Sequence, residues 1–175
     1  NMGYMFYKTG YQAMTELNLG SYFDTGSVTN MESMFTECGY KAMTSLCVSE
    51  NSSFCTDNVT NMSYMFYLTG YEAMSSLELG DFFDTSSVTD MAYMFCGTGK
   101  NKMKTLDLKN SFYTNNVTQM RHMFDGCGYY SLTTLNLGTN FNTKNVTNME
   151  YMFYTTGYQS MTSLKLGSEF ITSNV

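Results

Sequence analysis

The stretch Val59-Thr60-Asn61-Met62-Ser63-Tyr64-Met65-Phe66 decides the fold, because a version of it occurs six times in the 175 residues. The first methionine of each copy is residue 2, 31, 62, 91, 120 or 149, so successive copies are 29, 31, 29, 29 and 29 residues apart. We place the two extra residues of the second interval within Glu50-Asn51-Ser52-Ser53. A fixed period of this size is typical of a solenoid, in which each repeat forms one coil and buries its apolar side against its neighbours.

Positions within a repeat are counted from this methionine as position 0. Every copy has Met at position 3 and Phe at position 4, and Val precedes the later copies at position −3. Apolar residues at −3, 0, 3 and 4 form one stripe of a helix. Thr60 and its equivalents at position −2 suit a helix N-cap, and Gly70 and its equivalents at position 8 suit a left-handed end. The pattern predicts a short helix in each repeat, about two turns long, which only stacking can stabilise.

A segment of period two follows the glycine, as in Met74-Ser75-Ser76-Leu77-Glu78-Leu79. Such alternation indicates a half-buried strand. Phe at position 21 and Thr at position 23 hold the return loop, where we expect the threonine to hydrogen-bond backbone. The predicted fold is an α/β solenoid of leucine-rich-repeat-like coils, with one parallel β-strand and one short helix per 29-residue repeat. Leu77 should lie between Leu46 and Leu106, and the Met, Phe and Leu columns should stack as ladders.

The repeats run through residues 1–175 without an internal domain boundary. Neither the first nor the last repeat has the atypical composition of a capping repeat, so we expect a six-repeat segment of a longer solenoid. The net charge of −6 and the pI near 4.6 argue against a nucleic-acid partner, whose phosphates need a basic surface. No apolar run approaches the roughly 20 residues of a transmembrane segment, and no signal peptide is visible.

The run Leu79-Gly80-Asp81-Phe82-Phe83-Asp84-Thr85-Ser86-Ser87-Val88-Thr89-Asp90-Met91-Ala92-Tyr93-Met94-Phe95 resembles the repeat of BspA-type leucine-rich-repeat surface proteins. That repeat contains a phrase of the form Phe-Asp-Thr-Ser-x-Val-Thr-x-Met-x-x-Met-Phe, and the likeness covers the whole chain. The repeat here is longer around Gly10-Tyr11-Gln12-Ala13, and the family's cysteine after Met-Phe is kept only at Cys38 and Cys127. The resemblance implies a solenoid secreted or displayed by bacteria, and attachment to host or neighbouring cells as its role. It does not indicate the ligand.

Catalytic and metal-binding patterns are missing from the sequence. The single histidine, His122, stands in a column where four other copies have Tyr, and no carboxylate pair recurs. The five cysteines have no metal-ligand spacing. We therefore expect no enzyme, no cofactor and no metal site. Cys38 and Cys127 are expected to be buried thiols. Cys47 and Cys55, both in the irregular repeat, are either a disulfide that closes the enlarged loop or two independent substitutions.

Five glycosylation sequons begin at Asn51, Asn58, Asn61, Asn116 and Asn145. Asn beside Val-Thr is also explained by turn and cap chemistry, which we favour because the resemblance is mainly to bacterial proteins.

Two surfaces are candidates for binding. One is the strand face, made of the polar and varied residues at positions 14 and 16: Glu16, Asn18, Ser45, Ser76, Glu78, Thr105, Asp107, Thr134, Asn136, Ser163 and Lys165. The other is an aromatic strip formed by tyrosines at positions 2, 5 and 9: Tyr4, Tyr7, Tyr11, Tyr64, Tyr67, Tyr71, Tyr151, Tyr154 and Tyr158. These tyrosines either pack over the ladder or form an exposed strip for protein or glycan contacts.

The sequence therefore predicts an extracellular or cell-surface module for adhesion and protein–protein interaction. Its expected partners are a surface protein of a host or neighbouring cell, or a glycan, and further copies of the chain. We expect varied strand positions to suit one specific protein, and recurring tyrosines to suit a glycan or self-association. The alternative is a structural spacer or filament subunit that assembles end to end, because unpaired parallel strands are templates for further pairing.

Overall fold

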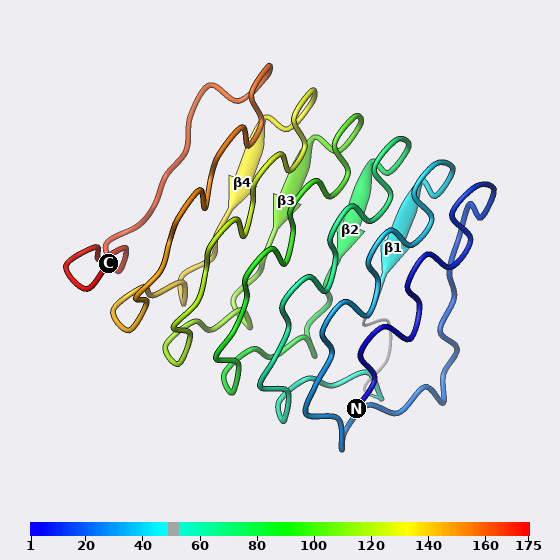
Figure 1. The fold of residues 1–175 in the computed structure, drawn as a ribbon, viewed down its shortest axis with the longest axis horizontal. Coiled ribbons are helices and arrows are strands. Elements are labelled where there is room, and N and C mark those ends of the chain that lie inside the picture. Colours follow the sequence, from blue (N-terminus) through cyan, green and yellow to red (C-terminus); the bar gives the residue numbers. More distant parts are fainter. Residues whose placement is uncertain (49–52) are drawn as a thin grey trace.

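The protein folds into six stacked coils, as a computed structural model of residues 1–48 and 53–175 shows (Figure 1). The coils comprise residues 2–30, 31–61, 62–90, 91–119, 120–148 and 149–175, one for each repeat. They lie side by side, so that the two ends of the chain are at opposite ends of the stack (Figure 1). The predicted position of the two-residue insertion lies mostly outside the described residues. The repetitive, solenoid-like architecture is as predicted.

Among the described residues, four short strands lie at the predicted places in the second to fifth coils: β1 (Ser45–Cys47), β2 (Ser76–Glu78), β3 (Thr105–Asp107) and β4 (Thr134–Asn136). The strands predicted for the first and sixth coils are not formed, so the expectation of one strand in every repeat is wrong at both ends of the stack. They pair in parallel as β1 with β2 and β3 with β4. Leu77 is opposite Leu46, as predicted. Leu106 pairs with Leu135, and no strand pairing joins Leu106 to Leu77. β2 and β3 contact each other but belong to separate sheets. The predicted continuous sheet is therefore two smaller ones.

The predicted helices are wrong: residues 1–48 and 53–175 contain no helix. The Met-Phe segments are chains of turns. Their N–H groups alternate between hydrogen bonds within the segment and hydrogen bonds to the next coil. The N–H groups of Met65 and Tyr67 donate to carbonyls three residues earlier, at 3.2 and 3.0 Å. The N–H groups of Tyr64 and Phe66 instead donate to carbonyls of the next coil, at 2.9 Å. An α-helix directs its interior amides within its own segment, whereas here every second amide joins two coils.

The turns require a left-handed backbone at position 2, where no copy has glycine. The six residues there have φ between 53° and 61°: Tyr4, Ser33, Tyr64, Tyr93, His122 and Tyr151. This conformation is unfavourable for L-amino acids. The hydrogen bonds between coils offset its cost. Thr60 is likewise not an N-cap, because its N–H and its Oγ1 both donate to the carbonyl of Thr29, at 2.9 and 3.1 Å.

Two phenylalanine columns form the centre of the core, and the predicted Phe ladder is confirmed. At position 4, the Phe66 ring stacks between Phe35 and Phe95 with centroids 5.5 Å away on both sides. At position 21, the rings of Phe83 and Phe112 are 6.4 Å apart. The methionines of the second to fifth coils are buried around these columns. Each coil is therefore held mainly by its neighbours.

The threonine column at position 23 bonds backbone, as predicted, but in the next coil. Thr56, Thr85 and Thr114 are fully buried, and each Oγ1 donates to a carbonyl of the following coil at 2.6 or 2.7 Å. A buried acceptor that loses its donor costs about 1–3 kcal/mol. These hydroxyls therefore join the return loops of adjacent coils.

We expect Thr85→Val to lower the free energy of unfolding by about 1–3 kcal/mol, because the carbonyl of Tyr113 would lose its hydroxyl donor. Urea denaturation followed by circular dichroism measures the change. Thr89→Val is the matched control: its Oγ1 also donates to a carbonyl of a neighbouring coil, that of Thr60, but the side chain is exposed and water can replace the bond. Equal losses in the two variants would contradict the role of burial.

Candidate binding surfaces

The strand face lies on the outward side of the sheets. All eleven residues predicted for it are exposed or half-buried, while the leucines that alternate with them point into the core. The strands themselves show this alternation: in β4 (Thr134–Asn136), Leu135 is buried between two exposed neighbours. The structure therefore brings the predicted residues together on one surface.

Asp107 is the most constrained side chain on this face. Its carboxylate accepts a hydrogen bond from Asn136 Nδ2 at 3.0 Å and another from the Lys109 N–H at 3.0 Å. Lys109 Nζ lies 3.4 Å from the other carboxylate oxygen. These contacts link adjacent coils and fix where the negative charge is presented.

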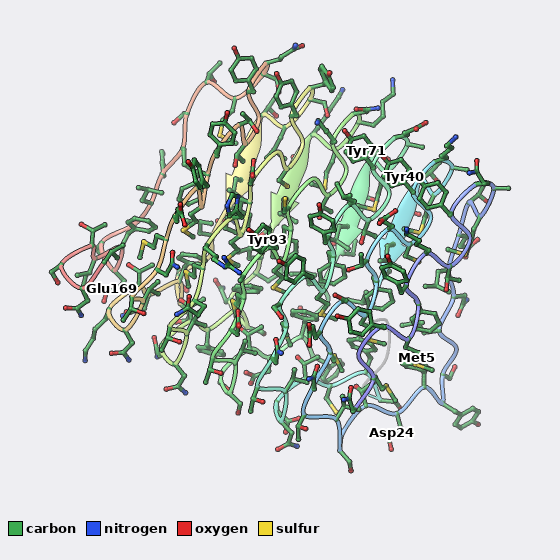
Figure 2. The ribbon with its side chains drawn as sticks, in the orientation of Figure 1. Met5, Asp24, Tyr40, Tyr71, Tyr93 and Glu169 are labelled. Carbon is green, nitrogen blue, oxygen red and sulfur yellow. The ribbon has the colours of Figure 1, made fainter. Side chains whose placement is uncertain are left out.

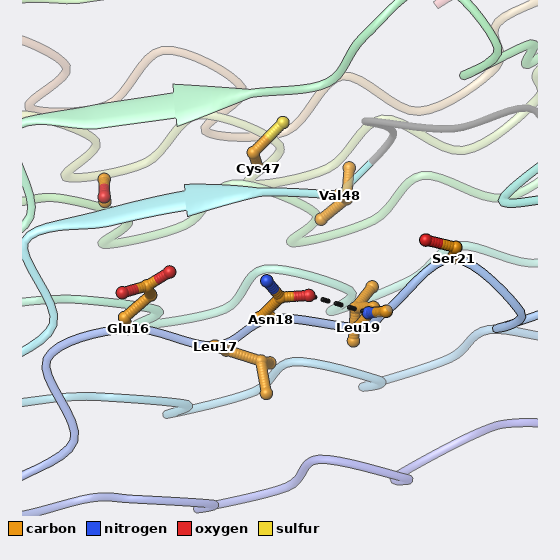
Figure 3. Close-up of a pocket in the computed structure, with 9 residues that line it drawn as sticks. Glu16, Leu17, Asn18, Leu19, Ser21, Cys47 and Val48 are labelled. Atoms are coloured by element: carbon orange, nitrogen blue, oxygen red, sulfur yellow. Dashed lines mark hydrogen bonds between the residues drawn. The ribbon is translucent and has the colours of Figure 1, made fainter.

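Two polar hollows open on the strand face. The first, of about 260 Å³, lies between the first coil and β1, and includes the predicted residues Glu16, Asn18 and Ser45 (Figure 3). Asn18 Oδ1 accepts a hydrogen bond from the Gly20 N–H at 2.8 Å beside it (Figure 3). The second, of about 290 Å³, includes Asp107 and Asn136. The face thus has shaped depressions as well as exposed groups.

Loop residues that no sequence pattern indicated complete the two hollows. In the first hollow they include Gly20, Ser21 and Val48, and in the second Asp81, Lys109 and Asn110 with Ser111. These residues follow the strands at positions 17 to 20, which the sequence patterns assigned to no binding surface. The glycine at position 18 was the available signal, because a left-handed residue there turns the chain across the end of the strand face.

The tyrosines at position 9 form a continuous stack along the solenoid. Tyr40 lies between Tyr11 and Tyr71 with ring centroids 4.7 Å apart on both sides, and Tyr40 and Tyr71 are labelled on adjacent coils in Figure 2. Lys100 takes the place of the ring in the fourth coil. Its Nζ lies 5.1 Å from the Tyr71 centroid and 5.0 Å from that of Tyr129. The cation therefore continues the stack by contacting a ring face on each side.

A second stack runs through position 2. Tyr93 lies between Tyr64 and His122, 4.6 Å from each, and His122 also stacks on Tyr151 at 4.9 Å. His122 Nδ1 is 2.9 Å from a carboxylate oxygen of Asp125. The only histidine is thus a member of an aromatic column, in the place where four other coils have tyrosine.

Stacking leaves the tyrosines with covered faces and exposed edges. Burial, with the neighbouring Tyr71 and Tyr11 as lesser causes, raises the pKa of Tyr40 to about 12. The most exposed rings of the strip lie in the first and sixth coils, where Tyr4 is 55% and Tyr158 67% exposed. A sugar ring that packs on an aromatic face would find the faces within the columns already occupied. This geometry favours the packing interpretation for the inner coils.

In three of the predicted sequons, the side-chain amide of the asparagine makes a hydrogen bond within the protein. Nδ2 of Asn58, Asn116 and Asn145 donates to a carbonyl of the preceding coil at 2.9, 2.7 and 2.6 Å. Asn61 Oδ1 accepts a hydrogen bond from the Ser63 N–H at 2.9 Å. These contacts support turn chemistry as the reason for the asparagines. Asn51 lies outside the described residues.

The structure contains no disulfide between Cys47 and Cys55, so the bond hypothesis is not supported. Cys47 is the last residue of β1. Cys55 lies in the return loop, where its Sγ is 4.0 Å from the Ser53 carbonyl. Cys38 and Cys127 are fully buried thiols, as expected. Burial raises the pKa of Cys38 to about 12.

We expect alkylation at pH 8 to separate Cys38 and Cys127 from Cys47 and Cys55. Cys38 and Cys127 are buried and remain protonated well above pH 8, so they should stay unmodified in the folded protein. Cys47 and Cys55 are half-exposed and should react. Iodoacetamide treatment followed by peptide mass spectrometry gives the modified sites, and treatment in urea provides the fully labelled control. Protection of Cys47 and Cys55 that disappears on reduction would instead restore the disulfide hypothesis.

Within residues 1–48 and 53–175, no group of three or more His, Cys, Asp or Glu side chains is arranged to hold a metal ion. In the same ranges no helix has the length and hydrophobicity of a membrane span.

Comparison with known proteins identifies one sequence family. The family described as "Mycoplasma protein of unknown function, DUF285" matches residues 1–76 and 40–163, two overlapping ranges that cover most of the chain. No curated protein and no solved structure matches the chain. The overlap of the two matches agrees with the repetitive fold. On the extent of this match, the chain belongs to the DUF285 family.

Proposed function

We propose that this protein is an adhesion module of an extracellular or cell-surface protein, which recognises a protein of another cell through its strand face. The observation that carries the proposal is a set of exposed side chains that differ from coil to coil on a repeated scaffold. Position 16 alone presents Asn18, Glu78, Asp107 and Lys165 in different coils. Such a surface is suited to one specific protein partner, because each coil contributes a different contact.

The two polar hollows strengthen the case for the strand face. Both include predicted strand-face residues, and binding sites are commonly concave with a few well-placed polar groups. Asp107 presents a charge held by two neighbours, so little side-chain entropy is lost when a partner contacts it. The resemblance to BspA-type leucine-rich-repeat surface proteins supports the same role and location, although the helix of the predicted coil is absent.

The aromatic strip is the weaker candidate for recognition. In the inner coils its ring faces contact one another, so it offers mainly hydroxyl groups and ring edges. A glycan ligand is therefore the second candidate, and it would have to use hydrogen bonds to these hydroxyl groups. The same experiment distinguishes the two surfaces.

Pull-down of proteins from host extracellular matrix and from host cell surfaces, with a glycan array in parallel, identifies the ligand. Replacing Glu78 and Asp107 by Lys should abolish binding of a protein partner. Replacing Asp24 and Asp57 by Lys is the matched control, because it changes the net charge equally at exposed positions in the return loops, away from the strand face and the aromatic strip. Circular dichroism checks that all variants fold.

Loss of binding in Glu78→Lys/Asp107→Lys, with retention in the control, would support the strand face. If binding survives that change but is lost in Tyr67→Ala/Tyr71→Ala, the aromatic strip is the recognition surface. Equal losses in the two charge variants would mean that long-range charge, not a defined face, drives the interaction.

A further inference from the structure

The fourth coil carries a concentration of positive charge in an otherwise acidic chain. Four of the nine basic residues lie within residues 100–109, although the net charge of the protein is −6. Lys100, Lys102 and Lys104 are in the loop that precedes β3, at positions 9, 11 and 13. At positions 9 to 13, the other five coils have one basic and one acidic residue between them. The loops before the strands line one edge of the stack, so this edge is locally basic at the fourth coil (Figure 1).

Two of these lysines present their ammonium groups to solvent. Lys102 and Lys104 are exposed, while Met103 between them is fully buried, so both lysines lie on the solvent side of the chain. In the described part of the chain, neither ammonium group is within ion-pair distance of a carboxylate. The next carboxylate along the chain, that of Asp107, already pairs with Lys109. The charges of Lys102 and Lys104 are therefore available to a partner.

Lys100 is held inside the column of tyrosines at position 9. It is half-buried, and its Nζ lies 5.1 Å from the ring centroid of Tyr71 and 5.0 Å from that of Tyr129. A ring face on each side stabilises the cation in this place. Lys100 is thus engaged within the protein, but its fixed charge adds to the positive potential beside the two exposed lysines.

An exposed aromatic ring lies at the same edge on the fifth coil. The Tyr130 N–H donates to the Lys100 carbonyl at 3.0 Å, and the Thr133 N–H donates to the Lys104 carbonyl at 2.9 Å, so the two loops run side by side. The Tyr130 ring meets Tyr129 edge-on, with an interplanar angle of 68°, and is 50% exposed. No other coil has an aromatic residue at position 10. This ring is therefore outside the stacked columns.

We infer that an acidic polysaccharide binds at this edge, on a site formed by Lys102, Lys104 and Tyr130. Carboxylate or sulfate groups of the polymer would pair with the two ammonium groups. The apolar face of a sugar ring would pack on the exposed ring of Tyr130, in the way that aromatic side chains bury apolar surface in other contacts. Nucleic acid fits less well, because its binding depends on many more phosphate contacts than two lysines can make. The site is separate from the strand face, and the inference does not depend on strand-face adhesion.

The test measures binding of fluorescently labelled heparin oligosaccharides and of hyaluronate by fluorescence anisotropy, with neutral dextran as the uncharged polysaccharide. The unmodified chain should bind at least one of the acidic polysaccharides, less tightly as the salt concentration rises, and should not bind dextran. Lys102→Gln/Lys104→Gln should bind about tenfold more weakly, because an exposed charge pair contributes on the order of threefold to an equilibrium constant.

Tyr130→Gln tests the aromatic contact separately. Other coils have glutamine at this position, at Gln12 and Gln159, so the fold accommodates it. This variant should bind the acidic polysaccharide about fivefold more weakly, because a ring contact is lost. Its dependence on salt should stay that of the unmodified chain, since no charge changes.

Lys8→Gln/Lys144→Gln is the matched control for charge. It removes the same net charge at exposed positions in the first coil and in the return loop of the fifth coil, and should bind like the unmodified chain. Circular dichroism verifies that all variants fold. Absence of binding to both acidic polysaccharides would overturn the inference, as would equal losses in the two lysine variants or full binding by Tyr130→Gln.

Poly-glutamate distinguishes a polysaccharide site from a site for acidic peptides. If poly-glutamate bound as tightly as the polysaccharides, the inference would be wrong and the lysines would belong to a peptide site. Self-association that is lost in Lys102→Gln/Lys104→Gln, without polysaccharide binding, would instead make a second copy of the acidic chain the partner. Loss of adhesion in the strand-face variants, with polysaccharide binding retained, would show that the two activities are separate.

Discussion

Phe66→Ala should lower the free energy of unfolding by about 3–5 kcal/mol, as for other buried phenylalanines replaced by alanine. The side chain is fully buried, and its ring contacts Phe35 and Phe95 at 5.5 Å and Phe83 at 6.2 Å. Truncation would leave a cavity where the two phenylalanine columns meet. Because coils are stabilised mainly by their neighbours, the damage should extend to both adjacent coils.

Urea denaturation followed by far-ultraviolet circular dichroism measures this loss. Tyr22→Ala provides the comparison, since it removes an aromatic ring that is 97% exposed and should change stability by less than about 0.5 kcal/mol. A change below about 1 kcal/mol for Phe66→Ala would mean that neighbouring side chains collapse into the space, contrary to a close-packed ladder.

Gly70→Ala should be nearly as damaging, although it adds only a methyl group. Gly70 has a φ of +54°, and an added Cβ would lie 2.4 Å from Cβ of the buried Met74. The left-handed backbone costs alanine about 1–2 kcal/mol, and overpacking adds about 1–3 kcal/mol. We expect a total loss of about 2–5 kcal/mol, measured by the same denaturation experiment.

Gly126→Ala separates the two causes of this loss. Gly126 has a similar φ of +64°, but the nearest atom to an added Cβ is Thr155 Oγ1 at 3.7 Å. This variant should therefore lose only the backbone contribution, about 1–2 kcal/mol. If the two variants were equally destabilised, the contact with Met74 would not be the reason that position 8 is always glycine.

The helix predicted for each repeat is absent from the described residues, and the reason is physical. Apolar residues at −3, 0, 3 and 4 face one side in a helix, but they also face one side in the observed chain of turns. The distinction lies in the even-numbered amides, which bond the next coil instead of their own segment. The available signal in the sequence was glycine at position 6, at Gly97 and Gly126, because glycine favours a left-handed backbone over a helix interior. The residues at position 6 of the other coils also have a positive φ: Lys8, Glu37, Leu68 and Thr155.

The candidate surfaces were predictable to different extents. Alternation in the strands correctly placed Glu78, Asp107 and Asn136 towards solvent. The hollows beside them were not predictable, since they depend on how the return loops cross the strand ends. The tyrosine columns could be recognised by their spacing, but only the structure decided that their faces are covered. It also showed that Lys100 fills the place of a missing ring.

The sequence by itself determined the repeat, the identity of the core columns and the parallel register of equivalent leucines. A strict period makes like residues meet like residues, so Phe66 must lie between Phe35 and Phe95 in any stacked arrangement. Only the tertiary structure decided the backbone path within each coil. The choice between a helix and a chain of turns depends on hydrogen bonds to a neighbouring coil, 29 or 31 residues away in sequence, and a local pattern contains no information about those bonds.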